Sequence, residues 1–118
     1  MSTIDILRRE TDTRDFKQGE TIFTEGEAGN GMFAVVAGGV DIVIKGAVVE
    51  HLTPGGVFGE MALIDARPRS ATAVAASDCT VALINEKRFL RLVELTPRFA
   101  LQMMQVISER LRRTETSK

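Results

Sequence analysis

The chain has 118 residues and a mass of 12.9 kDa, a length that supports one domain with a single core and excludes a large multidomain enzyme. Its 15 Lys and Arg residues nearly balance its 16 Asp and Glu residues. It therefore lacks the excess positive charge with which proteins bind nucleic acid or anionic membranes, and we expect no nucleic-acid partner.

The N-terminal residues and the cysteine content bear on where the protein is found. Only Ile4, Ile6 and Leu7 are apolar before a charged run begins at Arg8, which is unlike a secretory signal peptide. No stretch is long and apolar enough to span a bilayer. The single cysteine excludes an internal disulfide, which fits a reducing compartment. We expect a cytoplasmic protein with no membrane segment, and a weak opening helix over residues 2–9.

Short apolar runs separated by glycine-rich turn signals follow, up to Asn85. Val40, Ile42 and Ile44 alternate with other residues, as in a half-buried strand, and Lys45-Gly46-Ala47 predicts a hairpin turn. Such closely spaced strands indicate an antiparallel β-roll, a jelly-roll-like barrel, over about residues 14–85. The predicted strands are residues 21–24, 32–37, 40–45, 48–52, 70–76 and 80–85.

The last third of the chain changes to helical spacing. Phe89, Leu92 and Val93 predict a helix over residues 86–95. Thr96-Pro97 then supplies an N-cap followed by proline in the first turn, so a second helix is expected over residues 97–113. The fold class is thus mainly β with α: a β-roll, one short helical turn and two C-terminal helices, in one domain over residues 1–118.

The stretch from residue 57 to residue 75, VFGEMALIDARPRSATAVA, carries the chemistry. A short helical turn is expected to begin at Glu60, an exposed connection to contain Arg67, and the next strand to open at Arg69. Amide groups at a helix start and one guanidinium are what an enclosed phosphate monoanion needs. A carboxylate beside the phosphate would repel it, so Glu60 fits better as an acceptor for the hydroxyls of an attached sugar.

This stretch resembles the phosphate-binding cassette of the cyclic-nucleotide-binding domain family, F-G-E-x-A-L followed by P-R-S-A. Phe16-x-x-Gly19-Glu20 and the glycines that follow resemble the family's early β-roll, so the similarity extends over about residues 14–113. The two C-terminal helices would then correspond to the family's hinge and lid.

The resemblance implies a role for each cassette residue. Glu60 would accept from the ribose 2′-hydroxyl and Arg69 would pair with the cyclic phosphate, serving ligand rather than core. Backbone amides of the cassette would complete the phosphate shell, and Arg110 on the lid would contact the purine. Met61 and Leu63 are expected to serve mainly the core. The candidate ligand-binding residues are Phe58, Gly59, Glu60, Met61, Ala62, Arg69, Ser70, Ala71 and Arg110.

These observations predict a non-enzymatic cyclic-nucleotide sensor whose C-terminal helices close over the ligand. Cyclic AMP is favoured, and cyclic GMP stays open because Ser70 could serve the guanine 2-amino group. We expect no cofactor and no metal, a regulatory nucleotide as ligand, and a downstream protein of unknown identity. One alternative is a structural or protein-interaction module of the same fold that binds no nucleotide. A cupin-like metalloenzyme is disfavoured because His51 is the only histidine.

Overall fold

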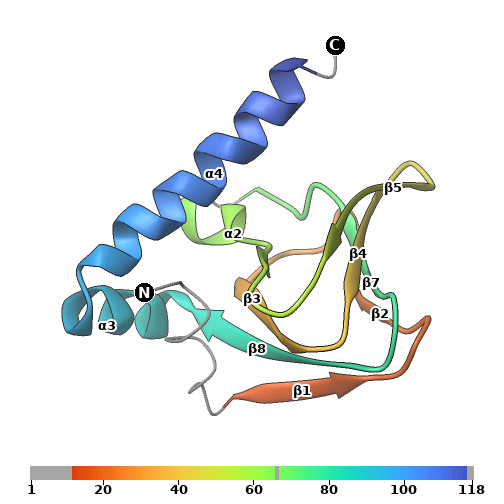
Figure 1. Ribbon diagram of the computed structural model, residues 1–118, viewed down its shortest axis with the longest axis horizontal. Coiled ribbons are helices and arrows are strands. Elements are labelled where there is room, and N and C mark those ends of the chain that lie inside the picture. Colours follow the sequence, from red (N-terminus) through yellow and green to blue (C-terminus); the bar gives the residue numbers. More distant parts are fainter. Residues whose placement is uncertain (1–11, 66, 117–118) are drawn as a thin grey trace.

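The computed structural model describes residues 12–65 and 67–116, with side chains through residue 112. Its strands form two open, four-stranded antiparallel sheets, with the helices at one end (Figure 1). The first sheet has the order β1-β8-β3-β6 and contains β1 (Thr13–Phe16), β3 (Gly31–Ala37), β6 (Val57–Phe58) and β8 (Cys79–Asn85). The second has the order β2-β7-β4-β5 and contains β2 (Thr21–Phe23), β4 (Val40–Ile44), β5 (Ala47–Leu52) and β7 (Thr72–Ala75). The helices are α2 (Met61–Ile64), α3 (Glu86–Leu95) and α4 (Arg98–Thr116).

The predicted fold class, a β-roll with a short helix and two C-terminal helices, is confirmed, although several boundaries differ. β1 and the two-residue β6 were not predicted. β7 begins at Thr72, so the prediction that Arg69 opens this strand is wrong. The lid helix continues to Thr116, beyond the predicted end at residue 113. The helix expected over residues 2–9 lies outside the described residues.

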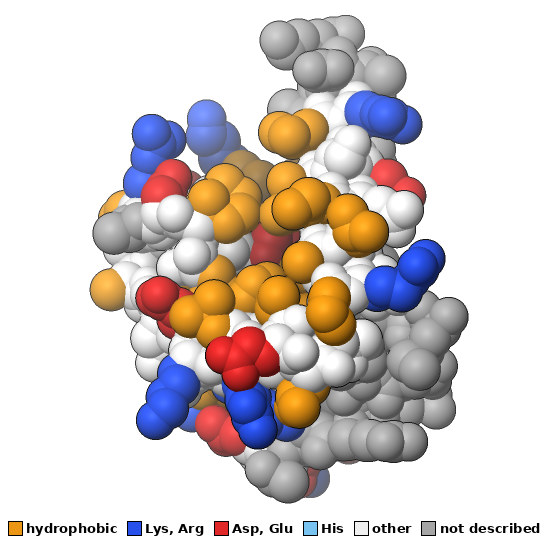
Figure 2. Space-filling model, turned by 90° about the vertical axis from the view of Figure 1, so that its left-hand side faces the viewer, with side chains coloured by type: hydrophobic (Ala, Val, Ile, Leu, Met, Phe, Trp, Pro, Cys, Tyr) orange, Lys and Arg blue, Asp and Glu red, His pale blue; other side chains and the backbone are white. Residues whose placement is uncertain are grey.

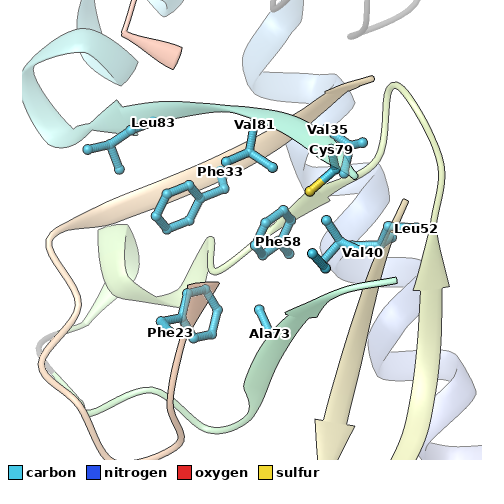
Figure 3. Packing of buried hydrophobic residues seen from close by; sticks show 11 residues of the cluster. Phe23, Phe33, Val35, Val40, Leu52, Phe58, Ala73, Cys79, Val81 and Leu83 are labelled. Carbon is cyan, nitrogen blue, oxygen red and sulfur yellow. The ribbon is translucent and has the colours of Figure 1, made fainter. Parts of the chain in front are cut away.

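The space between the two sheets is filled by a hydrophobic cluster with three phenylalanines at its centre (Figure 3). The rings of Phe33 and Phe58 stack at 5.3 Å, and Phe23 lies 5.8 Å from each of them. Such contacts stabilise the sheet pair beyond the apolar area that they bury. Phe23 and Phe58 are also the last residues of β2 and β6, so the core reaches the ends of both strands.

A second cluster joins the first sheet to the C-terminal helices. Met32 and Ala34 of β3 pack there against Phe99 and Met103 of α4, whereas Phe33 on the opposite face packs between the sheets. Because successive strand residues point to opposite faces, a strand covered on both faces must be apolar throughout. This explains why residues 31–35 are continuously apolar and buried.

One hairpin turn was predicted, whereas the cap of α3 was not. The predicted turn contains only Lys45 and Gly46, because Ala47 already belongs to β5. Both residues have positive φ, 51° and 80°, as a two-residue type I′ hairpin between β4 and β5 requires. The side-chain oxygen of Asn85 accepts a hydrogen bond of 2.8 Å from the Arg88 amide and caps α3. Among the described helices, none combines the length and hydropathy needed to cross a membrane.

Candidate functional site

The site is built around the turn from β6 into α2. Gly59 has a φ of 73°, which lets the chain reverse sharply after Phe58. A Cβ atom at Gly59 would lie 2.6 Å from Nη1 of Arg69, so glycine is also required by close packing. Glu60 follows as the N-cap residue of α2 and is only 8% exposed. The turn thus carries a carboxylate into the interior, directly after the glycine that packs against Arg69.

Arg69 is itself almost fully buried, with 8% of its surface exposed. Nη1 donates to the Gly59 carbonyl at 3.0 Å, and Nη2 donates to the Gly31 carbonyl at 2.9 Å. The guanidinium carbon lies 4.2 Å from the centre of the Phe23 ring, within range of a cation–π interaction. The expectation that Arg69 serves ligand and not the core is therefore too simple, because its side chain also closes one end of the core.

The guanidinium of Arg69 keeps unused capacity for an anion. Among the described residues, its buried Nε has no hydrogen-bond partner. Burial lowers the pKa of Arg69 because it disfavours the charged form, and the nearby Glu27 carboxylate opposes this effect. A buried cation with an unsatisfied donor gains free energy when an anion binds beside it. This part of the pocket therefore favours a phosphate-like group.

The connection between β2 and β3 holds Arg69 in place, which the sequence did not reveal. The Arg69 amide donates to the Glu27 carbonyl at 2.8 Å, and its carbonyl accepts from the Gly26 amide at 2.8 Å. A Cβ atom at Gly29 would lie 2.8 Å from Cζ of Arg69 and 2.9 Å from Cβ of Ala62. The closely spaced glycines of this connection were a sequence signal for such packing, because glycine often stands where another part of the chain approaches the backbone closely.

Arg110 crosses from α4 to meet the cassette. Its Nη1 forms an ion pair with Oε1 of Glu60, and its Nη2 donates to the Val57 carbonyl. The same guanidinium contacts Glu50 of β5, through Nε to Oε1 at 3.2 Å and Nη2 to Oε2 at 3.4 Å. The structure brings this lid residue to Glu60, and its contact with the purine stays a prediction. The contact with Glu50 was not predicted.

A pocket of about 850 Å³ lies between the cassette, the β4–β5 hairpin and α4. Figure 2 shows hydrophobic side chains gathered around a hollow on the face that it draws. All nine candidate residues of the sequence analysis line the pocket. The expectation that Met61 serves mainly the core is wrong, because 49% of it is exposed at the pocket, whereas Leu63 does pack against the second cluster. The lining residues outside this set of nine are Phe23, Ile42, Ile44, Val49, Glu50, Asp65, Arg67, Pro68, Ile107 and Leu111.

Strand alternation could have found part of this additional lining. Val40 is fully buried, Ile42 is partly buried, and Ile44 lies at the pocket, so one face of β4 leads from the core into the site. Glu50 precedes the buried Leu52 by two positions on β5 and therefore shares its face. A charged residue at an inward-facing strand position was the signal for Glu50.

Two other side chains singled out in the sequence lie outside the pocket lining. Cys79 is buried at the start of β8, and burial raises the pKa of its thiol, with the nearby Asp15 and Asp78 adding to the shift. His51 is exposed on β5, with Nδ1 2.7 Å from Oδ1 of Asp41. Within residues 12–65 and 67–116, no group of three or more His, Cys, Asp or Glu side chains could hold a metal ion.

The pocket can therefore hold a small amphipathic anion. Arg69 supplies a cation to the lining, Glu60 supplies an acceptor, and apolar side chains such as Ile42 and Ile107 provide walls for a flat ring. Ligand pockets commonly combine apolar walls with a few such polar groups. A phosphate joined to a sugar and a base has this arrangement of charge, hydroxyl and ring.

Similar proteins place this site in a known context. The chain is 26% identical over 121 residues to the "CRP-like cAMP-activated global transcriptional regulator" of Mycobacterium tuberculosis, covering 98% of this chain and 54% of the relative. The crystal structure of the Thermus thermophilus catabolite activator protein superposes with a TM-score of 0.84 at 29% identity, covering 98% of this chain and 56% of that one. A second similar structure, described with "A cyclic-GMP-dependent signalling pathway regulates bacterial phytopathogenesis", has a TM-score of 0.80 at 29% identity, and the match covers 93% of this chain and 91% of that one.

The chain spans about half the length of the transcriptional regulator and of the catabolite activator protein. All three similar proteins are named for regulation or signalling. The Mycobacterium tuberculosis relative is named as a transcriptional regulator. The prediction that this chain has no nucleic-acid partner therefore stays a prediction. The family model described as "Cyclic nucleotide-binding domain" matches residues 13–95, which include both sheets and the cassette. The chain therefore belongs to the cyclic nucleotide-binding domain family.

Proposed function

We propose that this domain is a non-enzymatic sensor that binds cyclic AMP and responds by closing α4 over the pocket. The observation that carries the proposal is Arg69, a buried guanidinium with an unpartnered Nε that shares one pocket with the buried carboxylate of Glu60. An isolated charge is costly to bury unless it has a function or a partner, and an anionic ligand supplies the partner.

Each part of the nucleotide has a complementary group in the pocket. The cyclic phosphate pairs with Arg69, and amides of Gly59 and Ser70 complete its shell. The ribose 2′-hydroxyl donates to Glu60. Phe58, Met61, Ala62 and Ala71 form the remaining cassette surface. The amide of Ala62 already donates to the Gly59 carbonyl at 3.3 Å, so Ala62 contributes to the phosphate shell more weakly than the sequence suggested.

The purine lies between the inward face of β4 and the distal half of α4. Ile42 and Ile44 provide one wall, and Ile107 and Leu111 the other. These α4 side chains give the ligand contacts that exist only when the helix lies over the pocket. A ligand can shift a conformational equilibrium only through such differential contacts, so cyclic nucleotide should favour the closed helix.

Cyclic GMP is the second candidate ligand, and Ser70 is the observation that favours it. The Ser70 side chain is exposed and lines the pocket, where its hydroxyl can accept from the guanine 2-amino group. A structure at 29% identity described with a cyclic-GMP-dependent pathway adds support. Cyclic AMP remains first, because the transcriptional regulator at 26% identity is named as cAMP-activated.

Titration calorimetry with cyclic AMP, cyclic GMP and linear 5′-AMP tests the proposal. We expect saturable binding of cyclic AMP, weaker cyclic GMP, and much weaker 5′-AMP because the pocket is proposed to enclose a monoanion. Absence of binding by both cyclic nucleotides would support the same-fold module without ligand. Hydrogen exchange tests closure: residues 107–112 should gain protection with cyclic AMP while the β-roll changes less. Equal protection in both conditions would refute closure while leaving ligand binding intact.

A further inference from the structure

The attachment of α4 to the rest of the domain differs along the helix. Phe99, Met103 and Val106 pack into the second hydrophobic cluster and fix the proximal half. Beyond Val106, Ile107 and Leu111 border the pocket, and Leu111 is 60% exposed. The polar contacts of Arg110 with Glu50 and Glu60 attach the distal half to the rest of the domain.

Glu50 fixes one edge of the Arg110 guanidinium. Nε and Nη2 face the two carboxylate oxygens of Glu50 at 3.2 and 3.4 Å, a side-on bidentate arrangement. The two side chains are 21% and 19% exposed, so water screens this pair less than a surface pair. A guanidinium is planar and rigid, so holding one edge determines the direction of the remaining nitrogen. That nitrogen, Nη1, is the one that pairs with Glu60.

The carboxylates of Glu50 and Glu60 come from segments that are distant in sequence, β5 and the start of α2. Both face the same cation, and they would repel each other without it. The contact with the Val57 carbonyl adds a third anchor from β6. Arg110 is therefore a junction whose orientation depends on Glu50.

We infer that Glu50 is a positioning residue for the ligand site: it orients Arg110 so that the guanidinium fixes the carboxylate of Glu60 toward the sugar hydroxyl. This inference rests on the proposed function. Glu50 contributes to affinity through Arg110 and Glu60 without contacting the phosphate. A carboxylate held in place beforehand loses less freedom when the hydroxyl binds, so the site is preorganised. The opposite role, in which Glu50 draws Arg110 away from Glu60, predicts tighter binding when Glu50 is removed.

Glu50→Gln tests this role with calorimetry on cyclic AMP and 2′-deoxy cyclic AMP. We expect cyclic AMP to bind roughly five- to ten-fold more weakly, the size of a typical coupling between contacting groups. The affinity for 2′-deoxy cyclic AMP, which lacks the hydroxyl, should fall by less than about two-fold in the same variant. In an Arg110→Ala background, Glu50→Gln should have almost no further effect. Asp41→Asn is the matched control, because it removes the same charge from the neighbouring strand and its partner is His51.

Equal losses for both ligands, additive losses with Arg110→Ala, or tighter binding by Glu50→Gln would each overturn the inference. If the wild-type protein binds no cyclic nucleotide, the proposed function fails, and hydrogen exchange without ligand separately tests the Glu50–Arg110 contact. Glu50→Gln should then exchange faster than Asp41→Asn in residues 107–112, with residues 98–106 unchanged. Equal exchange in the two variants would show that Glu50 does not hold the distal half of α4.

Discussion

Replacement of Arg69 by alanine should affect both stability and binding, because the structure gives this side chain two tasks. It removes two hydrogen bonds from a charged donor, to the carbonyls of Gly59 and Gly31, and a contact of 4.2 Å with the Phe23 ring. Hydrogen bonds to charged groups contribute about 1.5–3 kcal/mol each. Removing the buried charge recovers part of its desolvation cost, which the lowered pKa of Arg69 reflects. We therefore expect the free energy of unfolding to fall by about 1–3 kcal/mol.

The same variant should lose far more in ligand binding. Taking away one partner of a buried charge pair costs about 3–5 kcal/mol, or roughly two to three and a half decades of affinity. Arg69→Lys should recover little affinity, because an ammonium group cannot reproduce the planar fork that Gly59, Gly31 and a phosphate would share.

Urea unfolding and calorimetry on the same preparations separate the two effects. Arg91→Ala is the control, since this side chain is 59% exposed, pairs with Glu94 on α3 and lies outside the pocket lining. It should change stability by less than about 0.5 kcal/mol. If Arg69→Ala unfolds at the same urea midpoint as the wild type, the Arg69 side chain does not stabilise the fold. Binding of cyclic AMP within about three-fold of wild type would refute the phosphate assignment.

Three further changes test other parts of the site and core. Gly29→Ala should weaken cyclic AMP at least ten-fold, about 1.4 kcal/mol by calorimetry, because its Cβ would press on Arg69 and Ala62 at 2.8–2.9 Å; unchanged affinity would show that Arg69 need not stay in place. Glu60→Ala should weaken cyclic AMP but leave 2′-deoxy cyclic AMP nearly unchanged, whereas equal losses would count against the ribose role. Because burial raises the pKa of Cys79, the free energy of unfolding should fall as pH rises above about 8.5, and Cys79→Ala should remove that part of the pH dependence in urea titrations.

The fold was predictable where local patterns and long-range packing agree. Val40, Ile42 and Ile44 alternate because one face of β4 meets the core and then the pocket. β1 was not predictable from hydrophobicity, since in the described part of the chain it is a mostly exposed edge strand paired with β8. β6 contains only Val57 and Phe58, too few residues to show a period.

The candidate site was predictable as far as its residues lie within one segment. Glu60 and Arg69 belong to a recognisable stretch, and the structure brings them together with the other candidates in one pocket. The burial of Arg69 and the position of Glu50 depend instead on distant segments. The carbonyl of Gly31 belongs to β3, and the Glu50–Arg110 contact requires both the register of β5 and the path of α4. No local pattern in the sequence encodes these distances.

The uneven attachment of α4 gives the domain a physical route from ligand to output. Because Phe99 and Met103 share a core with β3, the proximal half of the helix should stay with the β-roll when the distal half moves. In Figure 1 the helix runs past α2 and extends beyond the sheets, so a small rotation about its anchored half gives a larger displacement at its far end. The contacts of Arg110 lie between that anchor and the far end, where they oppose rotation most directly. Ligand contacts at Ile107 and Leu111 would act on the same part of the helix, so binding and the Arg110 junction would set the position of α4 together.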